Sequence, residues 1–213
     1  MNQDSKEAFS FISCFNTFKD KTLFIDGNDK KISYEEFFKS CLVLKKNLDK
    51  KIKKNSKIFL ISNDSYFSFQ LIIVCLISSF ILVPIDPTFS KERLNKLKKI
   101  FKPEIVIRKR PKFKKFSGYS GEVKYNFSKK IKKSDFIIVL TSGTTGEPKG
   151  ILFNNQNYLL SSKSFSELVE YNYDTIVYHC LPTHYNAGIL NTFLSCIFSG
   201  SSIVIGEKLS LKV

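Results

Sequence analysis

The residues from Leu140 to Gly150 have the composition of a phosphate-binding loop. They read LTSGTTGEPKG, and Gly143 and Gly146 can adopt positive φ, so the backbone can fold around a ligand with no Cβ in the way. Successive backbone N–H groups in such a loop point inward and form a nest for an anion. Lys149 adds a full positive charge. Further donors are the hydroxyls of Thr141, Ser142, Thr144 and Thr145. These residues predict a cradle for phosphate groups.

The pattern differs from a Walker loop, which reads G-x-x-x-x-G-K-[ST] and opens directly into a helix. Here Pro148 precedes the lysine and Gly150 follows it. The apolar runs Phe136–Leu140 and Ile151–Phe153 on either side both predict strands. We therefore expect the loop to be the bend between two extended segments. A short GTTG alone would favour a Gly/Thr-rich surface turn, whereas the ten-residue string TSGTTGEPKG is far more specific.

That string resembles the phosphate-loop signature of the adenylate-forming enzymes, which include acyl-CoA synthetases, luciferases and the adenylation domains of peptide synthetases. KISYEEF at Lys31–Phe37 and VPIDPTFSKERL at Val83–Leu94 resemble two earlier signatures of the same family, in the same order. LPTHYNAG at Leu181–Gly188 is similar to an acyl-CoA synthetase pattern in which a histidine after a strand borders the acyl pocket. Residues Ile77–Ser79 depart from the family, which usually has a Lys-Ala-Gly-like step there.

The resemblance implies activation of a carboxylate by Mg-ATP to an acyl-adenylate, followed by transfer to a thiol of coenzyme A or a carrier protein. Thr141 would also reach Mg²⁺, a hard ion suited to oxygen ligands. Lys149 and His184 would be the catalytic residues, the first offsetting phosphate charge and the second shaping the carboxylate end of the substrate pocket. His179, inside a predicted strand, is expected to be structural. The residues implied for binding the β- and γ-phosphates are Thr141, Ser142, Gly143, Thr144, Thr145, Gly146 and Lys149.

The resemblance covers nearly all of residues 1–213 and implies an incomplete N-terminal large domain, because family members are more than twice as long. The adenine- and ribose-binding segments and the small C-terminal domain with its catalytic lysine are expected to be absent. We therefore expect the isolated chain neither to adenylate nor to thioesterify at a useful rate. The missing half could be a separate partner chain. Two alternatives stay open: a non-catalytic nucleotide-binding remnant or subunit of a split enzyme, and a basic protein that binds nucleic acid or membranes.

The net charge of +15 raises the nucleic-acid alternative. Only Arg93, Arg108 and Arg110 are arginines, however, and arginine is the residue preferred for bidentate recognition of phosphates and bases. The charge is thus expected to form a solvated surface, without specific nucleic-acid binding. Residues 108–133 are strongly basic with interleaved aromatics, which could form a platform for a single strand. We favour a lysine-rich connector between two strands for this segment.

The five cysteines are odd in number and widely spaced, which suits reduced, mostly buried thiols in the cytoplasm. No signal peptide is visible at the start of the chain. Ser65–Ile85 is uncharged and long enough to span a bilayer. It contains several serines, Gln70 and Pro84, so a buried helix at about Tyr66–Ser78 followed by a strand at Ile81–Ile85 is the better interpretation. No membrane span is expected.

The remaining patterns predict an α/β fold, a largely parallel sheet with helices on both faces, since strand–helix–strand units repeat along the chain. Ser33 and Glu36 have the spacing of a capping box. Gly200 is expected to end the helix that runs through Phe198. The other expected helices are Tyr34 to about Lys50, Lys91–Lys102 capped by Ser90, and one from Asn154 or Asn155 to about Tyr171. The other expected strands are Thr22–Ile25, Lys31–Tyr34, Lys57–Ser62, Glu104–Ile107, Thr175–Cys180 and Ser202–Ile205.

Overall fold

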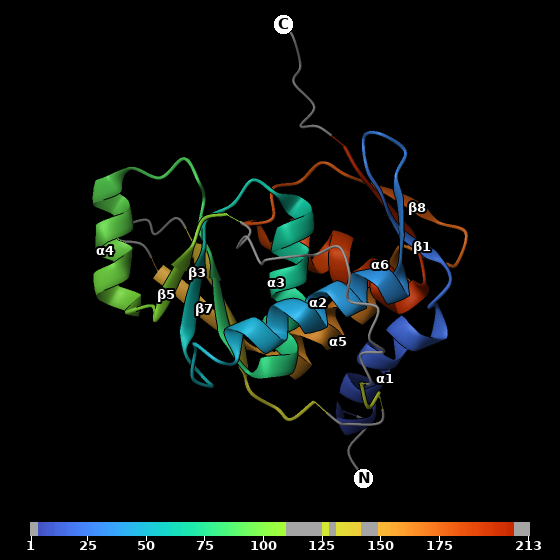
Figure 1. Ribbon diagram of the computed structural model, residues 1–213, viewed down its shortest axis with the longest axis horizontal. Helices are drawn as coiled ribbons and strands as arrows, with labels where there is room; N and C mark the ends of the chain where they lie inside the picture. Colours follow the sequence, from blue (N-terminus) through green and yellow to red (C-terminus); the bar gives the residue numbers. More distant parts are fainter. Residues whose placement is uncertain (1–3, 110–124, 128–130, 142–148, 207–213) are drawn as a thin grey trace, which may run out of the picture.

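The computed structural model describes residues 4–109, 125–127, 131–141 and 149–206 (Figure 1). The helices are α1 (Asp4–Thr17), α2 (Tyr34–Leu48), α3 (Ser65–Ser78), α4 (Lys91–Phe101), α5 (Asn155–Leu168), the π-helix η1 (Gly188–Leu194) and α6 (Ser195–Ser199). The strands are β1 (Thr22–Ile25), β2 (Lys31–Ser33), β3 (Lys57–Leu60), β4 (Ile81–Pro84), β5 (Ile105–Ile107), β6 (Asp135–Thr141), β7 (Lys149–Asn154), β8 (Ile176–His179) and β9 (Ser202–Ile205). Most bounds lie within a few residues of those predicted.

The strands form two sheets, and both are largely parallel. One sheet has the order β5-β3-β4-β6-β7, with only β7 antiparallel to its neighbour. The other has the order β2-β1-β9-β8, with only β2 antiparallel. The predicted α/β class is confirmed. The division into two sheets was not predicted, because it depends on β1 pairing with β9, which lies far along the chain.

The strands and the capping box predicted in the N-terminal part of the chain are confirmed. The expected strands at Thr22–Ile25 and Lys31–Tyr34 are present as β1 and β2, which pair antiparallel. Ser33 and Glu36 form the reciprocal capping box, with the Ser33 hydroxyl accepting from the Glu36 N–H and the Glu36 carboxylate accepting from the Ser33 N–H. This box starts α2, which buries an apolar stripe at helical spacing. The stripe consists of Phe37, Cys41, Leu44 and Leu48.

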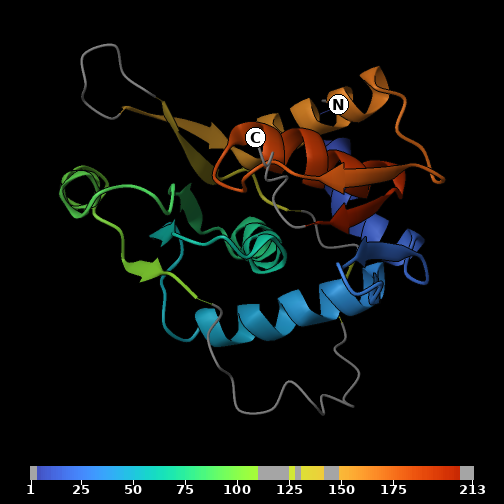
Figure 2. The same cartoon turned by 90° about the horizontal axis from the view of Figure 1, so that it is seen from above.

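Helix α3 lies at the centre of the molecule, where Figure 2 views it nearly end-on. Its side chains are buried on all faces, as expected of a helix that is hydrophobic all round. Asp64 caps it by accepting from the Phe67 N–H at 2.9 Å. The uncharged stretch Ser65–Ile85 is thus a buried helix followed by strand β4, as predicted. Among the described residues, no helix has both the length and the apolar character needed to cross a membrane.

Tyr34, in the KISYEEF stretch, links the start of α2 to residues near the C-terminal end of the described chain. Its side chain is fully buried, and its hydroxyl lies 2.7 Å from the Ser201 carbonyl and 3.1 Å from the Cys196 carbonyl. These acceptors belong to the turn that leads from α6 into β9. Gly200 ends α6 with φ of 72°, the left-handed conformation predicted for this glycine.

Two helical features differ from the sequence-based expectation. Helix α1 was not predicted, because its first residues are polar; it nevertheless buries Phe11, Ile12 and Phe15. The segment before Gly200 is a π-helix followed by a short α-helix instead of one continuous α-helix. In the widened turn, the Ser195 N–H reaches back to the Leu190 carbonyl, five residues earlier.

Within the described parts of the chain, β7 and β8 each have one side without a neighbouring strand. Both carry large exposed apolar side chains. Those on β8 are Ile176 and Tyr178, with 64% and 47% of their surface exposed. Those on β7 are Ile151 and Leu152, at 50% and 48%. Apolar side chains on an open strand edge favour pairing with further polypeptide.

Candidate functional site

The predicted phosphate loop connects β6 and β7, which pair as an antiparallel hairpin. Leu140 lies opposite Gly150, and Thr141 lies opposite Lys149. The Thr141 hydroxyl is 3.5 Å from the Lys149 carbonyl. The expected bend between two extended segments is therefore confirmed. The other predicted phosphate-binding residues, Ser142, Gly143, Thr144, Thr145 and Gly146, lie outside the described residues.

Gly150 seats this hairpin against α4. A Cβ on Gly150 would lie 2.5 Å from Ile138 Cγ2 and 2.8 Å from Phe101 Cζ. Phe101 in turn packs against Phe59 of β3, with ring centroids 6.5 Å apart. Real Cβ atoms do not approach other atoms so closely, so a side chain at this position would force Ile138 or Phe101 to shift. The last residue of the family-like string thus has a packing role.

Asp86 emerges beside the base of the loop. Strands β4 and β6 are parallel neighbours, with Leu82 paired to Ile137. Asp86 and Thr141 each lie four residues beyond that pair, so both chains reach the same edge of the sheet at the same level. The Asp86 Oδ1 atom accepts from the Thr88 N–H at 2.8 Å and from the Thr88 hydroxyl at 2.7 Å. These bonds fix the carboxylate and leave Oδ2 directed elsewhere.

That second oxygen lies 3.5 Å from His184 Nε2. The two side chains are only 20% and 13% exposed. His184 comes from the loop after β8, in the other sheet, so this contact joins the carboxyl ends of the two sheets. The sequence predicted that His184 follows a strand and borders the acyl pocket. The structure gives it a carboxylate neighbour, Asp86, just after β4, the strand next to β6.

The His184 loop is held in shape from both sides. The Tyr158 hydroxyl on α5 donates to Asn186 Oδ1 at 2.6 Å, and burial raises the pKa of this hydroxyl. Gly188 allows a close turn, because a Cβ there would lie 2.6 Å from the Pro182 carbonyl oxygen. The Gly188 N–H donates to the Tyr185 carbonyl at 3.1 Å. The LPTHYNAG stretch is therefore a fixed loop that presents His184.

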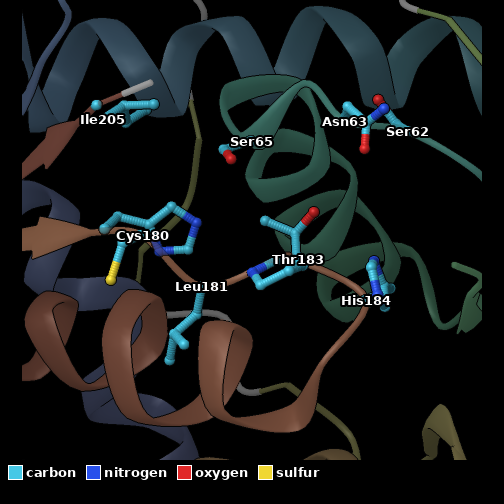
Figure 3. A pocket seen from close by; sticks show the side chains of 11 residues that line it. Ser62, Asn63, Ser65, Cys180, Leu181, Thr183, His184 and Ile205 are labelled. Carbon is cyan, nitrogen blue, oxygen red and sulfur yellow. The ribbon is translucent and has the colours of Figure 1, made fainter. Parts of the chain in front are cut away.

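A pocket of about 380 Å³ opens beside His184. It lies where β3, β8 and β9 end, which is the edge at which open parallel sheets bind ligands. Figure 3 shows Asn63, Ser65 and Thr183 around its opening. The lining residues are Ser62, Asn63, Ser65, His179, Cys180, Leu181, Pro182, Thr183, His184, Ile205 and Gly206. This volume falls within the usual range for small-molecule sites.

His179 lines this pocket, although the sequence assigned it only a structural role. Its side chain is 3% exposed and packs edge-on against Phe69, with ring centroids 4.8 Å apart. Neither ring nitrogen has a hydrogen-bond partner among the described residues. Burial lowers the pKa of the imidazole from 6.5 to about 4, so the ring is neutral at neutral pH. Its place at the last position of β8 is the only sequence signal that could have pointed to the pocket.

The described aromatic residues of the basic connector (residues 108–133) pack against helix α2. Tyr125 and Phe127 lie against Phe38 of α2, with ring centroids 5.1 Å and 5.5 Å apart. These two aromatic rings therefore fill a hydrophobic contact instead of forming an open stacking platform. Residues 110–124 and 128–130 of the connector lie outside the described part.

The described residues contain no group of three or more His, Cys, Asp and Glu side chains arranged to hold a metal ion. Oxygen donors at the loop base are the Thr141 hydroxyl and the nearby Asp86 carboxylate. The predicted contact of Thr141 with Mg²⁺ stays a prediction. Among the cysteines, Cys180 is exposed and the other four are buried, and none forms a disulfide within the described residues.

Comparisons with known proteins agree with this arrangement. The sequence profile of the AMP-binding enzymes matches residues 13–212. Malonate–CoA ligase ACSF3 of Homo sapiens, a mitochondrial protein, is 32% identical over 74 residues, which are 35% of this chain and 13% of that protein. Nonribosomal peptide synthetase GRA1 of Gibberella zeae is 25% identical over 202 residues, which are 88% of this chain and 3% of the synthetase.

Among solved structures, MatB from Rhodopseudomonas palustris with ATP bound superposes with a TM-score of 0.78 at 17% sequence identity. The match covers 96% of this chain and 46% of MatB. At that identity the likeness shows the fold. The chain spans less than half the length of this structural relative and a smaller share of the two sequence relatives.

Proposed function

The chain belongs to the AMP-binding enzyme family, and from this premise we propose that it takes part in ATP-dependent activation of a carboxylate as an acyl-adenylate. The observation that carries the proposal is the convergence at one edge of the two sheets. The base of the phosphate loop, the Asp86–His184 contact and the pocket all lie where parallel strands end. Open α/β sheets bind their ligands at that edge.

Thr141 and Lys149 are the described residues proposed to hold the β- and γ-phosphates of ATP, together with the loop between them. They fit this ligand chemically, since a hydroxyl donor and an ammonium group stand on opposite strands of one hairpin. We assign a Mg²⁺ contact to the Thr141 hydroxyl. The ion supplies charge neutralisation when it is bound.

His184 is proposed to orient the carboxylate of the substrate. Attack of a carboxylate on the α-phosphorus brings two anions together, so the reaction needs alignment and neutralised charge. The contact with Asp86 holds the imidazole at the mouth of the pocket. Lys149 would act on the β- and γ-phosphates of ATP, where it would offset negative charge on the departing pyrophosphate.

The later steps rest on the family alone. We propose that the acyl group passes to a thiol, either coenzyme A or a carrier-protein thiol. The substrate is a small-molecule carboxylate. We propose that turnover also needs the groups that relatives carry along a longer chain, which a separate partner chain would supply. We also propose a cytoplasmic location, because the five cysteines form no disulfide within the described residues.

ATP binding by the 213-residue chain tests the proposal. We expect Lys149→Ala to weaken Mg-ATP binding by roughly tenfold or more, since hydrogen bonds to charged groups contribute about 1.5–3 kcal/mol. Lys39→Ala is the matched control, because this lysine is also exposed but lies on α2 in an ion pair with Glu35. Isothermal titration of both variants and the wild type gives the affinities.

Equal ATP affinity of the Lys149→Ala variant and the wild type would contradict the assignment of the loop. A second measurement follows pyrophosphate release across a panel of carboxylic acids. Release that depends on the acid supports activation of a carboxylate. ATP binding without any acid-dependent release, even when the remaining half of a family member is supplied, would favour a non-catalytic nucleotide-binding protein.

A further inference from the structure

The pocket beside His184 is lined without any full charge. Among the described residues that line it, none is Asp, Glu, Lys or Arg. This is unusual for a chain with 34 basic and 19 acidic residues. The polar residues that line it are Ser62, Asn63, Ser65, Thr183, His179 and His184.

His179 has the unmet hydrogen-bonding capacity in this wall. A neutral imidazole carries one N–H donor and one acceptor nitrogen. Both are buried without a partner among the described residues, and an unsatisfied buried polar group destabilises the protein. A bound group that both donates and accepts a hydrogen bond would satisfy the ring. His184 lies on the same pocket wall, so a carboxylate oriented by His184 could extend towards His179.

We propose that this pocket is the subsite for the distal end of the acid substrate, and that it selects an uncharged group with both a donor and an acceptor, such as a carboxamide. The inference rests on the proposed function, since it takes the pocket to hold the activated acid. His179 is the specificity-determining residue.

Two competing distal groups fit less well. A second carboxylate offers only acceptors, and its charge would enter the pocket with no cation among the described lining residues to offset desolvation. An alkyl end offers neither donor nor acceptor and leaves both nitrogens of His179 unpaired. A site built to hydrogen-bond a substrate group discriminates strongly against analogues that lack the group.

Three four-carbon acids of similar size provide the test: succinamate, succinate and butyrate. The chain has only two histidines, so ¹⁵N-histidine labelling gives imidazole signals from His179 and His184 alone. We expect succinamate to shift the His179 ring signals on titration. Succinate and butyrate should bind at least about tenfold more weakly, because each leaves a buried polar group unpaired.

His179→Phe should abolish the preference for succinamate over butyrate, whereas His179→Gln, which keeps a donor and an acceptor, should retain it. Thr183→Val is a second variant of similar shape that should reduce the preference without removing a ring from the core. Circular dichroism confirms that each variant is folded. Equal binding of succinate and succinamate, or an unchanged preference in folded His179→Phe, would overturn the proposal.

These measurements use no ATP and no turnover. If the Lys149→Ala experiment contradicted the assignment of the phosphate loop, the preference for a carboxamide could therefore still be measured. Conversely, intact ATP binding with no preference among the acids would refute the subsite and leave the proposed activation of a carboxylate standing.

Discussion

At the scale of single residues, Gly150 links the phosphate-loop hairpin to the rest of its sheet. We expect Gly150→Ala to destabilise the protein by about 1–3 kcal/mol, the usual cost of forcing extra volume into a packed site. The new methyl group would meet Ile138 and Phe101, and Phe101 is itself packed against Phe59. Urea unfolding followed by circular dichroism measures the change.

Gly27→Ala is the matched control, because a Cβ on Gly27 would meet no atom within 4 Å. Its effect should stay within about 0.5 kcal/mol, as for most surface substitutions. A Gly150→Ala variant as stable as the Gly27→Ala variant would show that the hairpin moves away from α4 without cost.

At the same scale, some residues of the candidate site were predicted from the sequence and others were not. Thr141, Lys149 and His184 were found because they lie in recognisable strings. The structure puts Thr141 and Lys149 at strand ends and His184 in the loop after β8. The contact of His184 with Asp86 could not be predicted, because it depends on how two sheets lie relative to each other. His179 was assigned to the core from its strand pattern; only the three-dimensional arrangement shows that the buried ring also borders a pocket.

At the scale of elements, the Tyr34 hydroxyl connects the start of α2 to the turn between α6 and β9. We expect Tyr34→Phe to lower the free energy of unfolding by about 1–2 kcal/mol, because a buried acceptor loses its donor. The Ser201 and Cys196 carbonyls are the acceptors concerned. Amide hydrogen exchange of β9 should speed up more than that of β3, which lies in the other sheet.

Tyr173→Phe serves as the control for this change. Tyr173 is 55% exposed, and its ring would keep the contact with the Lys21 ammonium group. Its unfolding free energy should match that of the wild type. If Tyr34→Phe also left stability unchanged, the hydroxyl would not hold the two elements together.

Elements with strong local signals were predicted well. The capping box of α2 and the glycine end of α6 both depend on a few neighbouring residues. Helix α1 was missed because its apolar residues follow a polar start. The π-helix η1 was missed because its widened turn is set by tertiary contacts, including the Ser195 hydroxyl, which lies 2.7 Å from the Ser162 carbonyl on α5.

At the scale of the whole molecule, the two sheets share one hydrophobic core. Phe24 and Ile203 from one sheet belong to the same buried cluster as Ile58, Leu82 and Ile137 from the other. Phe24 stacks on Phe69 of the central helix α3, with ring centroids 5.7 Å apart. The relative placement of the sheets, and therefore of the site between their strand ends, is fixed by this common core.

The open side of β8 has a consequence for the colloidal behaviour of the chain. Ile176 and Tyr178 are exposed there, which favours edge-to-edge association of identical molecules. The net charge of +15 opposes it by mutual repulsion. Salt weakens this repulsion, because the Debye length falls from roughly 30 Å at 0.01 M to roughly 3 Å at 1 M ionic strength. We expect sedimentation velocity to show monomers at low salt and growing oligomers at high salt.

Ile176→Lys should keep the chain monomeric at both salt concentrations, since a lysine on an open edge blunts strand pairing. Oligomers that dissolve as salt is added would instead indicate an electrostatic contact. The association of this protein thus depends on a balance between apolar side chains on its open strands and the mutual repulsion of its lysine charges, so the ionic strength of the buffer decides whether its molecules stay apart.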